Sequence, residues 1–302
     1  MCYISRQLQL VDRKEQDIQQ FFEQYGPSAR DCYAFCATIS DYHAIVCHKV
    51  KRMGWKFLTT VLTSGAESFH MDEGSHKVIL ISPDPENRTR SLPSIITKTV
   101  VAILYEQDTQ ERWRNAHNLY RTLRQDPKMK SSSGWLLEPP FHALCVKGFK
   151  FKLYPMVIKP GGRVNDIFTD TAYVNTEDLV LPRQTRIIYN TESPVQSLDA
   201  DHYYQPARGT QASFDSFIYD PNVNQITMFQ ITTGHIHEMK PKGINFLRQL
   251  AEWLRPGELK LRYVAVVPEG HKVECPLAKA MEFTLDMWSL EVMEGELFGE
   301  DG

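Results

Sequence analysis

The strongest constraint on the fold lies in residues 213–232, which read SFDSFIYDPNVNQITMFQIT. Two runs rich in aromatic and β-branched residues flank a run of turn formers, DPNVN, at residues 220–224. This pattern predicts a β-hairpin. If Asp220 pairs with Gln225, the same antiparallel register places Asp215 opposite Gln230.

The hairpin register gathers three oxygen-bearing side chains on one face. Directly opposed residues have Cβ atoms about 4.5–5.5 Å apart, so the carboxylate of Asp215 and the amide of Gln230 should meet. Side chains alternate along a strand, so Thr232 shares the face of Gln230. Hard oxygen ligands of this kind suit a partly hydrated Mg²⁺. The alternative interpretation is an ordinary solvated hairpin face.

Composition limits the classes of function. The chain has 302 residues, 42% hydrophobic content and a net charge of −3, so a nucleic-acid contact must come from a local basic patch. Its six cysteines form no CxxC pair and show no zinc-finger spacing, which favours reduced thiols inside a cell. We find no signal-peptide core and no apolar run near the roughly 18 residues of a membrane span.

The N-terminal half reads as mainly helical. Amphipathic spacing predicts a helix over residues 12–25 and a longer helix over residues 28–53, which Ser28 can cap. The stretch QDPKMKSSS at residues 125–133 combines Pro, Lys and a serine run and is typical of a linker. These features predict two domains, residues 1–130 and residues 131–302.

Glu138 stands inside the apolar run GWLLEPPFHALCVKG. A carboxylate in such a run costs several kcal/mol unless it is paired or bound to metal. Pro139 and Pro140 are tolerated only in a first helical turn, so we expect the helix to begin or kink near Glu138. Local capping of that helix is the alternative role of Glu138.

The rest of the second domain predicts a mixed α/β fold, a central mixed sheet flanked by helices. The expected elements are strands at 149–158 and 186–189, a polar loop at 199–210, the hairpin, an amphipathic helix at 243–254, a buried strand at 260–267, a helix at 278–288 and a frayed acidic tail.

These motifs, in this order, resemble the PD-(D/E)XK (restriction-endonuclease-like) nuclease superfamily, and within it the nuclease module of Crinkler effectors and retrotransposon-hot-spot proteins. The matching segments are GWLLEPPFHAL, YYQP, FDSFIYD and FQITTGHIHEMKPKG, within residues 131–267. Residues 1–130 resemble more loosely the tail of the ATPase module that precedes this nuclease. A P-loop motif is absent from the sequence, so no ATPase activity is expected of this chain.

The resemblance implies a divalent-metal-dependent endonuclease that hydrolyses the phosphodiester bonds of DNA, as a Crinkler-type effector toxin. It makes Asp215 the central ligand of Mg²⁺ or Mn²⁺. Gln230 takes the Glu position of the (D/E)XK pair, and Glu138 matches the glutamate of the first helix. Both are further expected ligands.

The resemblance gives catalytic positions to three more side chains. Thr232 takes the position of the motif lysine, and His237 and Lys240 supply positive charge that orients water or stabilises the phosphorane. Lys242 competes with Lys240 for that role, and a zinc pair of His235 and His237 is a further alternative.

The chain also departs from the family pattern. Gln230 is neutral where the family has a carboxylate, and Thr232 cannot act as a lysine. These departures favour the alternative function, a non-catalytic nuclease-fold module that binds nucleic acid or a host protein. A third option gives residues 1–130 a protein-binding role.

The expected partner is therefore DNA, with RNA and a host protein as alternatives and no membrane. The expected location is intracellular and nuclear. An effector would be secreted and act in the host nucleus.

Overall fold

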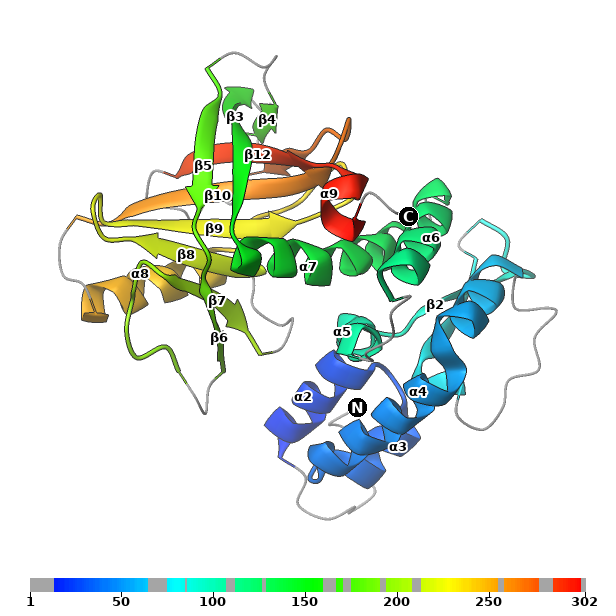
Figure 1. Cartoon of the computed structure of the whole chain (residues 1–302). Coiled ribbons are helices and arrows are strands. Elements are labelled where there is room, and N and C mark those ends of the chain that lie inside the picture. Colours follow the sequence, from blue (N-terminus) through cyan, green and yellow to red (C-terminus); the bar gives the residue numbers. More distant parts are fainter. Residues whose placement is uncertain are drawn as a thin grey trace. The chain divides into compact units, whose positions relative to one another are not determined.

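The computed structural model describes residues 14–64, 75–84, 86–106, 112–126, 129–159, 167–170, 175–190, 194–207, 213–254, 258–276 and 285–299. These residues form a mixed α/β structure with one large mixed sheet (Figure 1). The chain divides into two compact units, Met1–Leu136 and Leu137–Gly302. The division falls inside helix α7 (Lys130–Lys147), whereas the sequence placed it at residue 130.

The first unit is mainly helical. Its other helices are α2 (Glu15–Tyr25), α3 (Ala29–Phe35), α4 (Ile39–Ser64), α5 (Lys98–Glu106) and α6 (Arg112–Gln125). The predicted helix at 12–25 is confirmed over its described part, and it ends where Gly26 takes a φ of 82°. The rings of Phe21, Tyr25 and Tyr42 pack together with centroids 4.8–5.5 Å apart.

The single helix predicted over residues 28–53 is wrong, because two helices occupy this stretch. Ser28 does cap the first of them, α3, where its hydroxyl accepts the backbone N–H of Asp31 at 3.4 Å. After a short turn, α4 continues past residue 53 to Ser64. Gly54 divides α4 into two helical pieces, since its φ of 66° and ψ of 170° are not helical.

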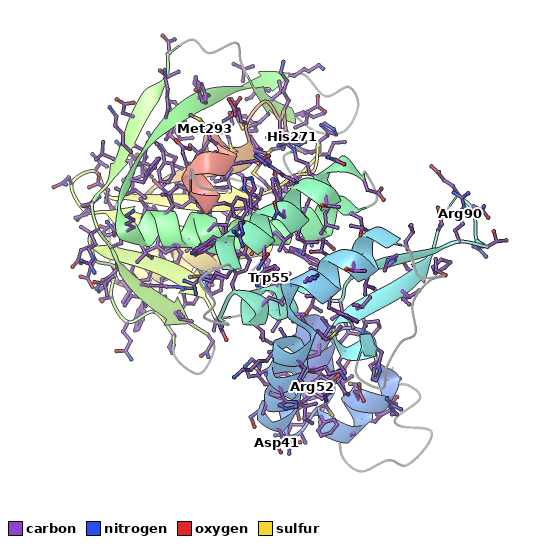
Figure 2. All side chains as sticks on the ribbon, turned by 45° about the vertical axis from the view of Figure 1, so that its right-hand side comes forward. Asp41, Arg52, Trp55, Arg90, His271 and Met293 are labelled. Atoms are coloured by element: carbon purple, nitrogen blue, oxygen red, sulfur yellow. The ribbon has the colours of Figure 1, made fainter. Side chains whose placement is uncertain are left out.

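A two-stranded antiparallel hairpin completes the first unit. Strand β1 (Ile79–Pro83) pairs with β2 (Ser91–Ile95), so that Ile79 lies opposite Ile95. The 3-10 turn η2 (Ser75–Lys77) precedes β1. Arg90 stands at the turn of this hairpin and projects away from its strands (Figure 2).

The predicted linker at 125–133 is wrong. Helix α7 begins at Lys130, and Ser132 and Ser133 are buried within it. A helix start near Glu138 is also wrong, since both prolines lie inside α7, and a kink there stays a prediction. Pro140 has no N–H for the carbonyl of Leu136, one helical turn earlier. The hydroxyl of Tyr105 donates to that carbonyl at 2.8 Å instead, which satisfies the acceptor that the proline leaves.

The second unit is built on a sheet of ten described strands (Figure 1). Nine follow the order β11-β4-β3-β12-β10-β9-β8-β7-β6, and β5 also pairs with β3. The strands are β3 (Phe149–Lys159), β4 (Ile167–Asp170), β5 (Glu177–Leu181), β6 (Thr185–Tyr189), β7 (His202–Pro206), β8 (Ser216–Asp220), β9 (Gln225–Ile231), β10 (Lys260–Pro268), β11 (Glu274–Pro276) and β12 (Asp286–Val292).

The centre of this sheet agrees with the sequence. Strands β8 and β9 form the predicted hairpin, and Asp220 pairs with Gln225 as expected. Helix α8 (Pro241–Leu254) follows, and the chain returns through β10, which lies parallel to both β9 and β12. The predicted strands at 149–158 and 260–267 and the predicted helix at 243–254 are therefore confirmed.

Three expectations for the second unit fail. The predicted polar loop at 199–210 contains β7, and the described end of the predicted helix at 278–288 belongs to β12. Residues 277–284 lie outside the described part. The tail forms the short helix α9 (Glu294–Phe298), in which Leu297 and Phe298 are buried rather than frayed.

Helices cover both faces of the sheet (Figure 1). On one face Ile244 and Leu247 of α8 join a core with Met228 of β9 and Tyr263 of β10. On the other face Phe141 of α7 packs against Phe229 of β9, with ring centroids 5.6 Å apart. The sheet is therefore the middle layer of the second unit.

Among the described residues, no helix has the length and apolar character needed to cross a membrane.

Candidate functional site

The predicted pair of Asp215 and Gln230 meets where the β8–β9 ladder ends. The last paired residues are Ser216 and Phe229, and the N–H of Asp215 donates to the carbonyl of Phe229 at 2.8 Å. Beyond this point the side chain of Asp215, and not the backbone, makes the next hydrogen bond between the strands. Its Oδ2 accepts the N–H of Ile231 at 2.8 Å. Only 6% of Asp215 is exposed, so this charge is held inside the protein.

Gln230 presents its amide nitrogen to the carboxylate. Nε2 donates to Oδ2 of Asp215 at 2.7 Å and to the carbonyl of Ile231 at 3.2 Å. The sequence led us to expect the amide oxygen here, as a metal ligand. The two neighbours are both acceptors, and this selects the donor end of the amide.

Hydrogen bonds join the residue that begins the hairpin segment to a residue that follows it. The hydroxyl of Ser213 accepts the N–H of Lys240 at 2.6 Å and donates to the carbonyl of Lys240 at 2.5 Å. Ser213 has a φ of 77°, which is uncommon outside glycine and is often found at functional sites. This double contact holds the basic segment around Lys240 beside the start of the hairpin.

His237 lies within reach of both charges of the site. Burial lowers the pKa of its imidazole below 6.5, the charge of Asp215 opposes that shift, and the charge of Lys240 adds to it. The net effect is a lowered pKa, so the ring is mostly neutral near pH 7. A neutral imidazole can accept a proton, as a general base must.

The other two predicted catalytic positions have different surroundings. Thr232 is buried, and its hydroxyl accepts the N–H of Gly234 at 3.1 Å within a tight turn. Glu138 is half-buried on α7, one turn before His142. Both keep their predicted roles as hypotheses.

A buried polar chain that the sequence reasoning missed supports the hairpin from the α7 side. Nδ1 of His142 lies 2.7 Å from the hydroxyl of Tyr203, which lies 2.6 Å from the hydroxyl of Ser216, the neighbour of Asp215. All three residues are buried. A signal was present, since His142 follows Glu138 by one helical turn and Tyr203 belongs to the YYQP motif.

The donor set does not fit the acid-rich metal site that the resemblance implies. Asp215 supplies one carboxylate, and its Oδ2 already receives two N–H groups. Gln230 adds a nitrogen donor rather than an oxygen ligand. Within the described ranges, no group of three or more His, Cys, Asp and Glu side chains is arranged to hold a metal ion.

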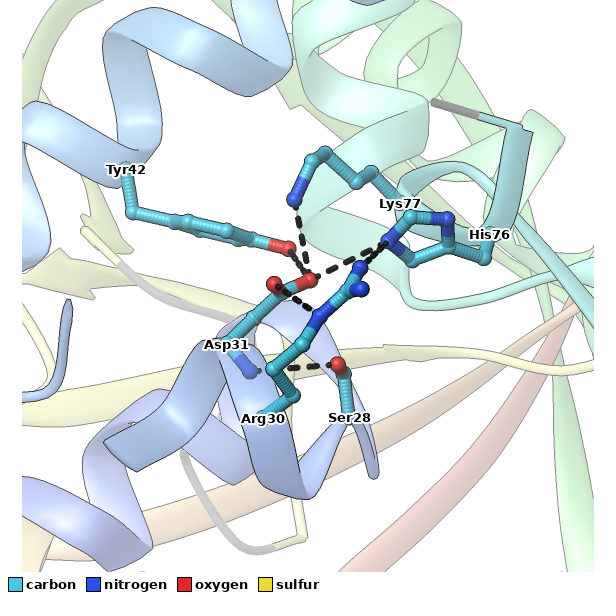
Figure 3. Close-up of polar contacts among 6 residues, drawn as sticks. All are labelled: Ser28, Arg30, Asp31, Tyr42, His76 and Lys77. Atoms are coloured by element: carbon cyan, nitrogen blue, oxygen red, sulfur yellow. Dashed lines mark hydrogen bonds and ion pairs between the residues drawn. The ribbon is translucent and has the colours of Figure 1, made fainter. Parts of the chain in front are cut away.

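A second buried carboxylate lies in the first unit and is surrounded by basic groups (Figure 3). Oδ2 of Asp31 accepts hydrogen bonds from Nζ of Lys77 and the hydroxyl of Tyr42, both at 2.9 Å. His76 lies 3.4 Å from the same oxygen, and Arg30 lies 3.6 Å from Oδ1. This cluster joins α3, α4 and η2 and reads as a structural clamp.

A pocket of about 820 Å³ opens at the opposite end of the central strands, beside Gln225 and Lys260 at the starts of β9 and β10. Its charges are largely matched, since Arg262 contacts Asp286 at 2.9 Å and Arg248 lies 3.9 Å from Glu252. This pocket is separate from the Asp215 site.

Comparisons of the chain with protein-family models, with curated proteins and with solved structures found no match.

Proposed function

We propose that the second unit is a restriction-endonuclease-like module that binds the phosphate backbone of nucleic acid beside Asp215. The fold part is supported by the order of its elements, in which the β8–β9 hairpin, helix α8 and the parallel strand β10 follow one another as the resemblance requires. DNA is the expected form of the nucleic acid.

One observation carries the binding part of the proposal. The double hydrogen bond between Ser213 and Lys240 fixes an exposed basic segment next to a buried polar cluster. Lys240 and Lys242 are both exposed and stand two residues apart on this segment. Local positive charge of this kind can bind phosphates although the chain as a whole carries a net charge of −3.

Fluorescence anisotropy with a labelled DNA duplex, titrated at several salt concentrations, tests the proposal. Replacing Lys240 and Lys242 together by Ala should weaken binding and reduce the slope of log K against log salt by about 2, because each phosphate contact contributes about 0.9. The matched control is the double replacement of Lys150 and Lys152, two exposed lysines two residues apart on β3. Equal losses in both double variants would contradict the proposal.

A divalent-metal-dependent endonuclease is the second candidate, and the state of His237 favours it. A neutral imidazole within range of Asp215 and Lys240 suits general-base chemistry on a water molecule. The test is plasmid nicking with Mg²⁺ or Mn²⁺ and with a chelator. This candidate expects nicking that Asp215→Ala and His237→Gln each reduce at least about 100-fold. Nicking that is equal in wild type and Asp215→Ala would eliminate it.

A further inference from the structure

We infer that the side-chain amide of Gln230 takes the place of a divalent cation beside Asp215, so that this site holds a phosphate backbone without metal. The phosphate part rests on the proposed function above. The metal part depends only on the contacts within the hairpin.

The carboxylate of Asp215 already receives hydrogen bonds from protein donors. A buried carboxylate needs hydrogen bonds or a counter-ion, and Oδ2 receives two short ones, from Gln230 Nε2 at 2.7 Å and from Ile231 N at 2.8 Å. These lengths are typical of hydrogen bonds strengthened by a full charge. The folded site is thus complete without an ion at this oxygen.

The orientation of the amide is fixed by two acceptors. One amide hydrogen of Gln230 points to Asp215 and the other to the carbonyl of Ile231, 3.2 Å away. Turning the amide over would place its oxygen against two other oxygens and would lose both bonds. Such a rotation is costly in a residue that is 8% exposed.

The same arrangement disfavours Mg²⁺. This ion requires near-octahedral oxygen ligands at about 2.0–2.1 Å. At Oδ2 of Asp215 the directions from which an ion would approach are taken by N–H groups, which repel a cation. The amide N–H of Gln230 therefore occupies the position at Oδ2 that an ion would take, and it offers the carboxylate a hydrogen bond in place of a positive charge.

The inference predicts that one added carboxylate turns this site into a metal-binding site. Glu at position 230 cannot donate to Asp215 or to the carbonyl of Ile231, so three oxygens would face one another. Two opposed carboxylates raise the energy of the folded protein unless a proton or a cation lies between them. Gln230→Glu should therefore lower the Tm without metal and make the protein respond to it.

The experiment measures Tm by thermal denaturation in chelator and in Mg²⁺ or Mn²⁺. Gln230→Glu should gain about 5–10 °C at a metal concentration roughly 100 times its Kd. Wild type should gain no more than Gln225→Glu, the matched control that adds the same charge at the other end of β9. A gain in wild type as large as in Gln230→Glu overturns the inference. So does a gain in Gln230→Glu no larger than in the control.

A second measurement tests the inference if Gln230→Glu does not fold. Isothermal titration with Mn²⁺ should give the same result for wild type and for Asp215→Asn. Mn²⁺ binding that is present in wild type and lost in Asp215→Asn would overturn the inference. Duplex binding by wild type should be unchanged by a chelator, and a loss in chelator would also overturn it. Absence of duplex binding in every condition rejects the proposed function and leaves the metal result standing.

Discussion

The two units each bury an aspartate, and the two carboxylates are balanced in opposite ways. Asp31 and Asp215 are 4% and 6% exposed. Asp31 faces the cations Lys77 and Arg30 together with His76, whereas Asp215 accepts hydrogen bonds from a neutral amide and a backbone N–H. A carboxylate paired with cations of its own unit acts as a structural clamp, because its charge is neutralised within the fold.

Two of the hydrogen bonds that Asp215 accepts come from neutral donors, and the nearby Lys240 and Lys242 are exposed. The charges of Asp215 and Lys240 both shift the pKa of His237, in opposite directions. An arrangement of this kind leaves the cations available to an anionic ligand. The difference in counter-groups, rather than the depth of burial, therefore separates a structural site from a candidate functional one.

The largest expected effect comes from breaking the clamp. Asp31→Asn leaves the ammonium of Lys77, whose side chain is 14% exposed, without its buried counter-charge. Loss of one partner of a buried ion pair costs about 3 kcal/mol, which should appear as lost amide-exchange protection in α3 and α4. The control Asp41→Asn changes an exposed residue of α4 (labelled in Figure 2) and should cost about 0.5 kcal/mol or less. Equal costs would show that Asp31 is no clamp.

The corresponding change at the second site should cost less. Asp215→Asn keeps an oxygen acceptor for the donors from Gln230 and Ile231 and removes the charge from those two bonds, at a cost of about 1 kcal/mol. Exchange protection of β8 and β9 measures it. Asp220→Asn at the hairpin turn is the control, because an Asn oxygen can also accept the N–H of Asn222. A loss in Asp215→Asn as large as in Asp31→Asn would remove the distinction between the sites.

Acid should destabilise the clamp. Burial alone raises the pKa of Asp31, but the hydrogen bonds from Lys77 and Tyr42 and the charge of Lys77 outweigh it and lower the pKa below 3.8. A carboxyl with a lowered folded pKa stabilises fully above its unfolded pKa and loses that contribution as pH falls through the folded value. Exchange protection of α3 should therefore fall below about pH 4. In Asp31→Asn that acid-dependent loss should disappear, and an unchanged acid profile would contradict the assignment.

The smallest effect concerns His237. Its pKa in the folded protein lies below 6.5, so the unfolded chain binds the proton more readily. The contribution of the neutral imidazole to the stability of the fold is therefore full above pH 6.5 and falls as the pH drops. His237→Gln should flatten the pH dependence of protection in the hairpin between about pH 7 and pH 5. His235→Gln, an exposed neighbour, should leave that dependence as in wild type. A steep profile that survives in His237→Gln would contradict a half-buried neutral imidazole.

Local chemistry explains which expectations held. The turn formers at 220–224 and the aromatic and β-branched runs on both sides predict the hairpin, since both act over a few residues. The apolar spacing of α8 and the continuous apolar run of β10 depend on periodicity in the same way. Strands β7 and β12 were missed because their local sequences do not favour a strand. His202–Pro206 lies in a polar stretch that is typical of a loop, and Asp286–Val292 overlaps a segment that was predicted to be helical.

The sequence by itself determined that Asp215 meets Gln230 at the end of a hairpin. Only the tertiary structure decided that the amide offers its nitrogen, because that choice depends on the carbonyl of Ile231 as well as on the carboxylate. It also decided that Ser213 holds Lys240 and that Asp31 gathers Lys77, contacts between residues 27 and 46 positions apart. Pairings at such separations follow from packing of the whole unit, which no local pattern encodes.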